Sequence, residues 1–412
     1  MANTVLTSSI IAETSVKILE NELVMANLVY RGYENEFDNR VNGYKPGASV
    51  SIRKPTQFTV RDGAVSSSQD VVEGTTSITV NKQKGVDFEF TSSDLTLKIG
   101  ELADRVIKPA MVQLANQVDQ DLMALYKDIP NWVGTPGQVV NSFADFAKAP
   151  ERLDLGAVPS DMRSAVLSPT DQWGMLGSQT ALYMQDAAKD AYRKAKLGVI
   201  GGVDTYSTQN VPTHTVGPLG GSPLVNGANQ ATTYAATKDT GTQSLITDGW
   251  TAAAAARVKA GDVFTIANVY DVNPITKAVL PHLKQFTVVA DASSDGSGNA
   301  TLTIAPAIIA SGAFQNVSAG PADNAAMTFL GTAATGYAQN LVFHKNAFAL
   351  AMVPLVAPPG AVDVARKSTN GLSVRVIPFY DGVNDVSKWR LDILYGVKTI
   401  DPRLAARLSG SP

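Results

Sequence analysis

Apolar residues at helical spacing dominate the stretch between residues 109 and 129. They recur every three or four positions, while glutamines and a lysine occupy the opposite side. The apolar positions are Met111, Leu114, Val118, Leu122, Leu125 and Ile129. Pro109 either fits a first helical turn, where no N–H is needed, or kinks a longer helix that begins near Ile99, and Pro130 ends the pattern. The spacing predicts an amphipathic helix of roughly 30 Å, around which the β-rich flanking sequence is organised.

A second amphipathic helix is predicted near the N-terminus, within residues 1–41. Its apolar positions are Val16, Leu19, Leu23, Ala26 and Tyr30. The segment carries three basic residues against six acidic ones, and the acidic residues include Glu34, Glu36 and Asp38. Two interpretations stay open: an ordinary solvated helix, which charge alone favours, or an arm that docks on a neighbour or on a basic partner.

Residues 42–91 alternate between apolar and polar side chains in two stretches, which predicts the two long strands of a hairpin. The alternating apolar positions are Val50, Ile52, Phe58 and Val60, and then Ile78, Val80, Val86, Phe88 and Phe90. Residues 62–76 between them are rich in Gly, Ser and charged residues. A hairpin with so few large apolar residues cannot bury itself, so we expect it to project and to lie on another surface.

Four charged residues of this hairpin are candidates for contacts between subunits: Arg53, Lys54, Arg61 and Asp62. A single exposed ion pair contributes only about 0–1 kcal/mol, so these residues must act collectively. The arm and the hairpin both have little apolar surface to bury within their own chain. We therefore expect both to lie on sister copies.

The second half of the chain differs in composition and in its pattern of apolar residues. The last glutamate is Glu151, and residues 223–336 contain many short alternating stretches separated by turns. This block is predicted to be a small antiparallel β-barrel or sandwich, inserted between two parts of a larger domain. Its segment 291–299 has the first half of a calcium-loop spacing, but Leu302 stands where the bidentate glutamate belongs, so a turn is favoured.

Shorter signals predict further elements. Residues 142–153, and a stretch from Pro169 to about residue 196, have the features of helices, while residues 374–376 and 389–397 alternate as strands. Glycines between 198 and 202 suggest a phosphate-binding loop. They follow a helix and precede no Gly-Lys-Ser/Thr, which argues against nucleotide binding.

Composition narrows the functions further. The 412 residues carry a net charge of −3, so no global basic excess is present to hold nucleic acid. Cysteine is absent, and the three histidines, His214, His282 and His344, are scattered. We predict no catalytic, metal or cofactor site. The chain begins without a signal-peptide pattern and has no apolar run long enough to span a membrane, so we expect a soluble protein made in a cytoplasm.

Weak motifs follow one another along nearly the whole chain. They are Leu19-Glu20-Asn21 with residues 28–34, Arg53-Lys54-Pro55 with residues 58–63, Leu114-Ala115-Asn116 with Val118-Asp119, residues 198–212, and residues 347–350 with residues 390–397. In this order and spacing, the chain resembles the major capsid (coat) proteins of tailed double-stranded-DNA bacteriophages. The resemblance is to the short-tailed-phage type, whose capsid fold carries an inserted β-domain.

The resemblance implies an α+β fold of the tailed-phage and herpesvirus capsid-shell type. Its parts are a spine helix, peripheral and axial domains, an extended β-hairpin loop and an inserted antiparallel β-barrel. The implied segments are an N-terminal arm at 1–41, the extended loop at 42–91, a peripheral domain with the spine helix at 92–141, an axial domain at 142–222, the inserted barrel at 223–336, and a return to the axial and peripheral domains at 337–412.

The resemblance also implies a function. Such proteins are not enzymes; their hexamers and pentamers tile an icosahedral shell around the genome, formed first as a procapsid around a scaffolding protein. The implied partners are sister copies, a scaffolding protein, a portal protein and packaged double-stranded DNA contacted without sequence specificity, with no cofactor and no membrane. The implied location is the virion, after assembly in the bacterial cytoplasm. Family regions that contact neighbours match Glu34, Glu36, Asp38, Arg53, Lys54, Arg61 and Asp62.

Other classes of protein stay open at this point. A phage decoration protein, or another surface- or glycan-binding β-protein, would use the 223–336 block as its active module and would not self-assemble. An enzyme is disfavoured by the missing motifs. A shell that encapsulates enzymes has a similar fold, but the inserted domain argues against it.

Overall fold

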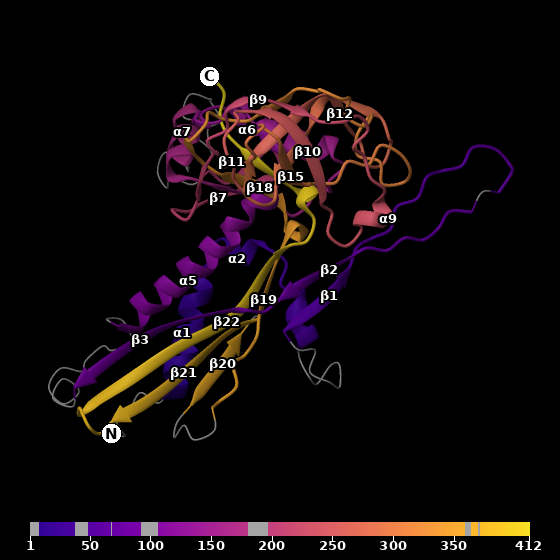
Figure 1. The fold of residues 1–412 in the computed structure, drawn as a ribbon. Helices are drawn as coiled ribbons and strands as arrows, with labels where there is room; N and C mark the ends of the chain where they lie inside the picture. The colour runs from indigo at the N-terminus through magenta and orange to yellow at the C-terminus, as the bar shows by residue number, and fades with distance from the viewer. Residues whose placement is uncertain are drawn as a thin grey trace. The chain divides into compact units, whose positions relative to one another are not determined.

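The computed structural model describes residues 8–37, 48–66, 68–91, 106–179, 197–358, 364–369 and 371–412. Figure 1 shows the course of the chain. The chain forms two compact units, and each is assembled from segments that are far apart in sequence. Unit 1 comprises Met1–Ser51, Ser77–Met123 and Phe348–Lys398, and unit 2 comprises Ile52–Thr76, Ala124–Ala347 and Thr399–Pro412.

Unit 1 combines a β-sheet with helices that pack on it (Figure 1). The sheet has the order β19-β22-β21-β20, and β3 pairs with β22 as well. The strands are β3 (Lys82–Thr91), β19 (Phe348–Met352), β20 (Ala365–Thr369), β21 (Leu372–Asp381) and β22 (Val386–Thr399). The helices are α1 (Ser8–Glu22), α2 (Met25–Leu28), the 3-10 helix η1 (Gly32–Phe37) and α5 (Lys108–Met123).

Helix α5 confirms the helix predicted from residue 109. Its apolar stripe is buried, including Leu114, Val118 and Leu122. The last predicted turns tighten into the 3-10 helix η3 (Ala124–Asp128), so the regular helix is shorter than the apolar pattern. The boundary between the two units falls where α5 ends and η3 begins.

Asp119 anchors the segment after α1 to the middle of α5. Its side chain is only 1% exposed, and its carboxylate accepts hydrogen bonds from the N–H groups of Val24 at 2.8 Å and Ala26 at 3.0 Å. These N–H groups lie at the start of α2, where no intrahelical partner exists for them. A polar residue within the α5 stripe thus satisfies donors that would otherwise be buried without partners.

Helix α1 packs on its own unit. Ile11, Val16 and Leu19 are at most 1% exposed, and the helix lies against α5, β20 and β21. The expectation that the arm has little to bury within its own chain is therefore wrong for this helix. Its apolar stripe, which predicted the helix, is satisfied inside the subunit.

Strand β3 corrects the hairpin prediction. The predicted second strand, residues 78–90, is instead divided into β2 (Thr75–Thr79) and β3. Strand β3 pairs antiparallel with β22, from Lys82 opposite Tyr395 to Thr91 opposite Val386. Alternation of apolar and polar residues shows that a strand has one face to bury, but it does not identify the strand with which it pairs. The 14-residue strand β22 supplies that partner from near the C-terminus.

Strands β21 and β22 confirm the two strands predicted near the C-terminus. They pair antiparallel, with Arg375 opposite Asp392. Asp392 is 1% exposed and forms ion pairs with Arg375 at 2.6 Å and Arg390 at 2.8 Å. Two guanidinium groups on one buried carboxylate compensate its desolvation within the sheet.

Unit 2 contains a six-stranded mixed sheet of order β4-β23-β18-β5-β7-β6. Helices α6 and α7 contribute Phe146, Leu153 and Met175 to a core shared with Leu167 and Val342. Helix α6 starts at the predicted place, with Ser142 as its cap. The elements are β4 (Trp132–Val133), α6 (Phe143–Leu155), β5 (Arg163–Leu167), α7 (Pro169–Gln179), β6 (Val199–Ile200), β7 (Val203–Ser207), β18 (Asn340–His344) and β23 (Ala405–Leu408). The glycines at 201 and 202 form the turn between β6 and β7, and the predicted continuation of α7 to residue 196 lies outside the described residues.

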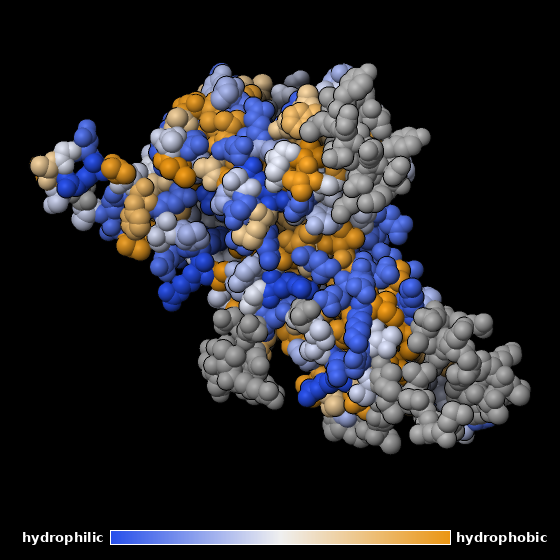
Figure 2. Space-filling model, turned by 180° about the vertical axis from the view of Figure 1, so that it is seen from behind, coloured by the Kyte–Doolittle hydropathy of each residue, from blue (hydrophilic) through white to orange (hydrophobic). Residues whose placement is uncertain are grey.

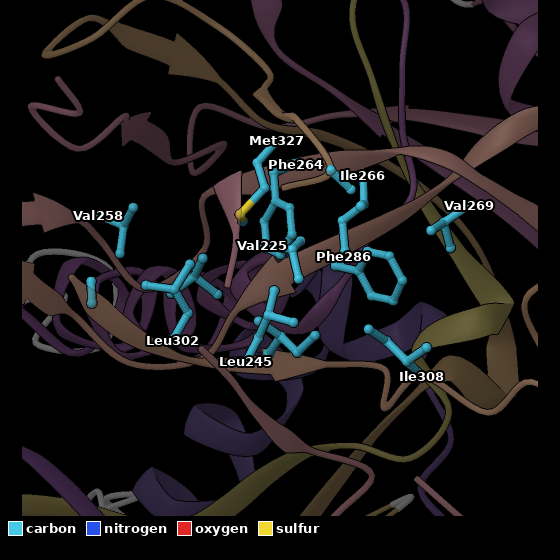
Figure 3. Close-up of a cluster of buried hydrophobic side chains, with 14 of the residues drawn as sticks. Val225, Leu245, Val258, Phe264, Ile266, Val269, Phe286, Leu302, Ile308 and Met327 are labelled. Carbon is cyan, nitrogen blue, oxygen red and sulfur yellow. The ribbon is translucent and has the colours of Figure 1, made fainter. Parts of the chain in front are cut away.

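The other large sheet of unit 2 is an antiparallel β-barrel of order β16-β12-β13-β15-β10-β9. A bridge between Leu224 and Ala326 joins its two ends and closes the sheet. Figure 3 shows Phe264, Phe286 and Leu302 among the buried side chains of its core. The strands are β9 (Gly221–Val225), β10 (Gln243–Trp250), β12 (Val263–Val272), β13 (Val279–Val288), β15 (Ala300–Ala305) and β16 (Met327–Phe329). The predicted antiparallel barrel is confirmed.

Smaller elements flank the barrel. The short strands β11 (Ala255–Val258) and β14 (Ala292–Ser294) form a separate pair, as do β8 (Thr213–Thr215) and β17 (Gly336–Ala338). Helix α9 (Tyr234–Thr237) lies in the connection from β9 to β10. The predicted turn after β14 is held by Asp295, whose Oδ1 accepts from the N–H groups of Ser297 and Asn299, both at 2.8 Å.

Candidate functional site

The candidate site is the segment 54–74, which we call the extended loop. It joins β1 (Ser49–Arg53) to β2, and these two strands form a two-stranded sheet. Figure 1 shows the loop as a long excursion away from the barrel of unit 2, and Figure 2 shows apolar and hydrophilic residues side by side on it. Its two ends are held together by the N–H of Lys54, which donates to the carbonyl of Gly74 at 2.8 Å.

The predicted strand through Phe58 and Val60 is wrong, because the described part of the extended loop contains no strand. A side chain takes the place of a strand partner there. The N–H of Thr59 donates to Oε1 of Gln69 at 2.9 Å, and Nε2 of Gln69 donates to the carbonyl of Thr59 at 2.6 Å. Gln69 thereby holds the two arms of the loop together without a backbone ladder.

The extended loop exposes four large apolar side chains. Phe58 is 56% exposed, Val60 100%, Val65 85% and Val71 64%. Burial of apolar surface contributes about 25 cal/mol per Å², and a cluster of such side chains on one projecting segment is typical of an interaction surface. The sequence analysis chose the charged residues of this loop as contact candidates and did not include its exposed apolar residues.

The four charged candidates of the hairpin differ in their surroundings. Arg53 is exposed and lies 3.5 Å from the carboxylate of Glu73. Lys54 donates through Nζ to the carbonyl oxygen of Lys238 at 3.0 Å. Arg61 donates to the carbonyl oxygens of Gly63 and Val65 and so shapes the tip of the loop, where Asp62 is exposed.

The acidic candidates lie elsewhere. Glu34 is in η1, and burial raises the pKa of its carboxyl to about 8, against the opposing effects of Arg31 and a backbone hydrogen bond from Met352. A side chain at Gly371, where φ is +76°, would collide with this carboxylate. The side chain of Glu36 and all of Asp38 lie outside the described residues.

Glu34 predicts a pH dependence of stability. Because its folded-state pKa of about 8 lies above the ordinary value of 4.5, its neutral form stabilises unit 1 fully below pH 4.5. That contribution declines as the pH rises and is lost above pH 8. Urea unfolding of the monomer between pH 5 and pH 9 should therefore show a loss of stability that Glu34→Gln does not share. Parallel pH profiles for the two proteins would contradict this prediction.

Unit 2 contains a buried polar network that the sequence analysis did not connect. His214 is 3% exposed; its Nδ1 lies 3.0 Å from the Tyr126 hydroxyl, and its Nε2 lies 2.8 Å from Oδ1 of Asp262. Arg407 is fully buried, stacks on the Tyr126 ring at 5.2 Å and donates to the carbonyl of Gly261 at 2.7 Å. Desolvation lowers the pKa of Arg407 to about 9. The network could not be predicted from a local sequence motif, because its residues come from segments that are far apart in the sequence.

The network explains a buried histidine without invoking a ligand, since both ring nitrogens have protein partners. His282 lies 3.3 Å from the carboxylate of Asp271, which Lys284 also contacts at 2.9 Å. Among the described residues, no group of three or more His, Asp or Glu side chains is arranged to hold a metal ion. Within the same part of the chain, no helix has the length and apolar character needed to cross a membrane.

One family matches nearly the whole chain. The model of the family described as "P22 coat protein - gene protein 5" matches residues 1–410. A protein called "Major capsid protein" from Acyrthosiphon pisum secondary endosymbiont phage 1 is 22% identical over 382 residues, which is 89% of this chain and 90% of that protein. A solved structure from Mycobacterium phage Che8 has a TM-score of 0.50 at 14% identity, covering 93% of this chain and 90% of that one.

The family match over nearly the whole chain places the protein in the class of phage coat proteins, and the likeness to the solved phage structure shows a shared fold. Within that class, this chain belongs to the P22 coat protein family. It is a phage major capsid protein, which forms the icosahedral shell of the virion from copies of itself.

Proposed function

We propose that this coat protein assembles in the bacterial cytoplasm as a scaffold-assisted procapsid, which receives double-stranded DNA through a portal protein. Membership in the coat-protein family supports this role. The net charge of −3 is compatible with a wall that contacts DNA without gripping it. The role is structural, and we assign no catalytic step to the chain.

The extended loop makes the contacts between neighbouring copies. The observation that carries this assignment is the exposure of its apolar side chains, above all Val60, which is 100% exposed. Each contact is modest, but closed symmetry repeats it around the shell and makes the sum cooperative. Asp62, exposed between Val60 and Val65, is the polar contact on this surface. Glu34, Arg53 and Lys54 instead have partners inside their own subunit.

The segments inferred from the family take roles in this scheme. Residues 1–41 form the arm, 42–91 contain the extended loop, 92–141 the peripheral domain with its spine helix, and 142–222 the axial domain. The barrel segment 223–336 is the insertion, and 337–412 return to the axial and peripheral domains. The test of the scheme as a whole is electron microscopy of the purified protein with and without scaffold, which should show closed particles of uniform size.

The loop assignment predicts an assembly defect. The double variant Val60→Asp/Val65→Asp places two carboxylates where apolar contact is expected, so the yield of closed particles should fall at least tenfold. The stability of the monomer should change by less than about 0.5 kcal/mol, because both side chains are largely exposed. Sedimentation and negative-stain microscopy measure the yield, and urea unfolding measures stability.

The matched control is Val60→Leu/Val65→Leu, which keeps the apolar surface and should assemble. If the aspartate variant forms normal shells in normal yield, the extended loop is not a principal contact between copies, and the assignment fails.

A further inference from the structure

The base of the extended loop is fastened to the corner formed by α9 and the two residues that follow it. The N–H and the hydroxyl of Thr75 both donate to Oδ1 of Asp239, at 2.8 and 2.9 Å. From the other arm of the loop, Nζ of Lys54 donates to the carbonyl oxygens of Lys238 at 3.0 Å and Asp239 at 3.4 Å. Both arms of the loop are therefore held at one place.

Gly74 fits closely into the same corner. It is buried, and a Cβ added to it would overlap the carbonyl oxygen of Lys238 and come within 2.7 Å of the Tyr234 hydroxyl. The Tyr234 ring in turn stacks on Phe314, with centroids 3.4 Å apart and planes within 5° of parallel. A glycine is needed here for close approach of the backbone, not for an unusual φ.

A further anchor holds the outgoing arm of the loop. The side-chain amide of Gln57, oriented by its neighbours, donates to the carbonyl of Ala313 at 2.9 Å and accepts from Nη1 of Arg403 at 3.0 Å. Beyond it, from Phe58 to Val71, the described loop residues are mostly exposed. The fastened part thus ends at residue 57 on one arm and resumes at Gly74 on the other.

We propose that the inserted barrel positions the extended loop of its own subunit, with the corner of Tyr234, Lys238 and Asp239 acting as the docking site for the base of the loop. This inference rests on the proposed role of the loop in assembly. It adds that the direction in which the loop leaves the subunit is set by the insertion, so that adjustment between neighbours takes place only from residue 58 to residue 73. Hydrogen bonds from Thr75 also hold the pKa of the Asp239 carboxyl below its usual range.

Hydrogen exchange of the unassembled full-length chain tests the docking. Asp239→Ala removes the acceptor for both Thr75 donors, so exchange at residues 74–79 and 50–54 should accelerate about threefold to tenfold. Asp239→Asn keeps an acceptor oxygen and should exchange like the wild type. Lys238→Ala is the control for the neighbouring ion pair: it removes the contact of Nζ with Oδ2 of Asp239 at 3.2 Å but keeps both Thr75 hydrogen bonds to Oδ1 and the backbone carbonyl of Lys238 that the loop contacts.

A second variant disrupts the same docking contact by steric overlap. Gly74→Val inserts a side chain between the loop and the carbonyl of Lys238 and should accelerate exchange in the same segments. Exchange in β12 reports whether the barrel remains folded and should be unchanged in every variant. Unchanged exchange at 74–79 in both Asp239→Ala and Gly74→Val would overturn the docking.

Assembly of the same variants separates this inference from the proposed function. Asp239→Ala and Gly74→Val should give at least a threefold lower yield of uniform particles, with more open or misshapen shells, while Asp239→Asn and Lys238→Ala assemble normally. A loosened loop with normal particles would refute the positioning role and leave the loop contact intact. Normal particles from the Val60→Asp/Val65→Asp variant would instead refute the proposed contact itself.

Discussion

Replacing Phe264 by alanine is expected to lower the free energy of unfolding of the barrel by about 3–5 kcal/mol. Phe264 is fully buried, and its ring lies 5.7 Å from that of Phe286 and 5.2 Å from that of Phe329. Three aromatic rings from β12, β13 and β16 meet there, so truncation leaves a cavity that strands of a closed barrel cannot collapse to fill. Urea unfolding of the monomer, monitored by hydrogen exchange in β12 and β15, measures the loss.

Two variants show whether the loss comes from the core. Phe264→Leu retains most of the buried volume and should cost clearly less than the alanine variant. Ile246→Thr alters a β10 side chain that is 50% exposed and should change stability by no more than about 0.5 kcal/mol. An alanine variant as stable as Ile246→Thr would show that this cluster does not hold the barrel together.

Elements with a strong local period could be predicted from the sequence. Helix α5 follows its apolar stripe, α6 begins at its Ser142 cap, and α7 begins at Pro169 in the first helical position. The barrel follows from alternation between closely spaced turns, because each of its strands has one face inside. Each of these patterns lies within one short stretch of the sequence, so it can be recognised without knowing the rest of the fold.

Pairing between distant strands could not be predicted in the same way. Strand β3 alternates as a hairpin strand does, yet its partner β22 lies about three hundred residues later in the sequence. The alternation at Phe58 and Val60 predicted a strand where the structure has none. There the backbone has no strand partner, and Gln69 occupies the polar groups of Thr59.

The candidate site was only partly visible in the sequence for a related reason. The sequence predicts that the loop projects, because the loop has too few large apolar residues to form a core of its own. Its charged residues can also be read directly from the sequence. The burial of Glu34 depends on Gly371, and the corner that holds Gly74 depends on Tyr234 and Lys238. Such close contacts arise only when distant segments fold together, so no motif encodes them.

Asp119→Ala is expected to lower the free energy of unfolding of unit 1 by about 2–5 kcal/mol, because it leaves the buried N–H of Ala26 and the partly buried N–H of Val24 without an acceptor. Gln120→Ala is the matched control, since Gln120 is exposed on the same helix and alanine favours helix there. In urea unfolding, the control should stay within about 0.5 kcal/mol of the wild type. Hydrogen exchange in Asp119→Ala should accelerate first at residues 23–30, because the carboxylate holds that turn to α5. Equal stability of the two variants would mean that packing of α1 alone keeps the N-terminal segment on α5.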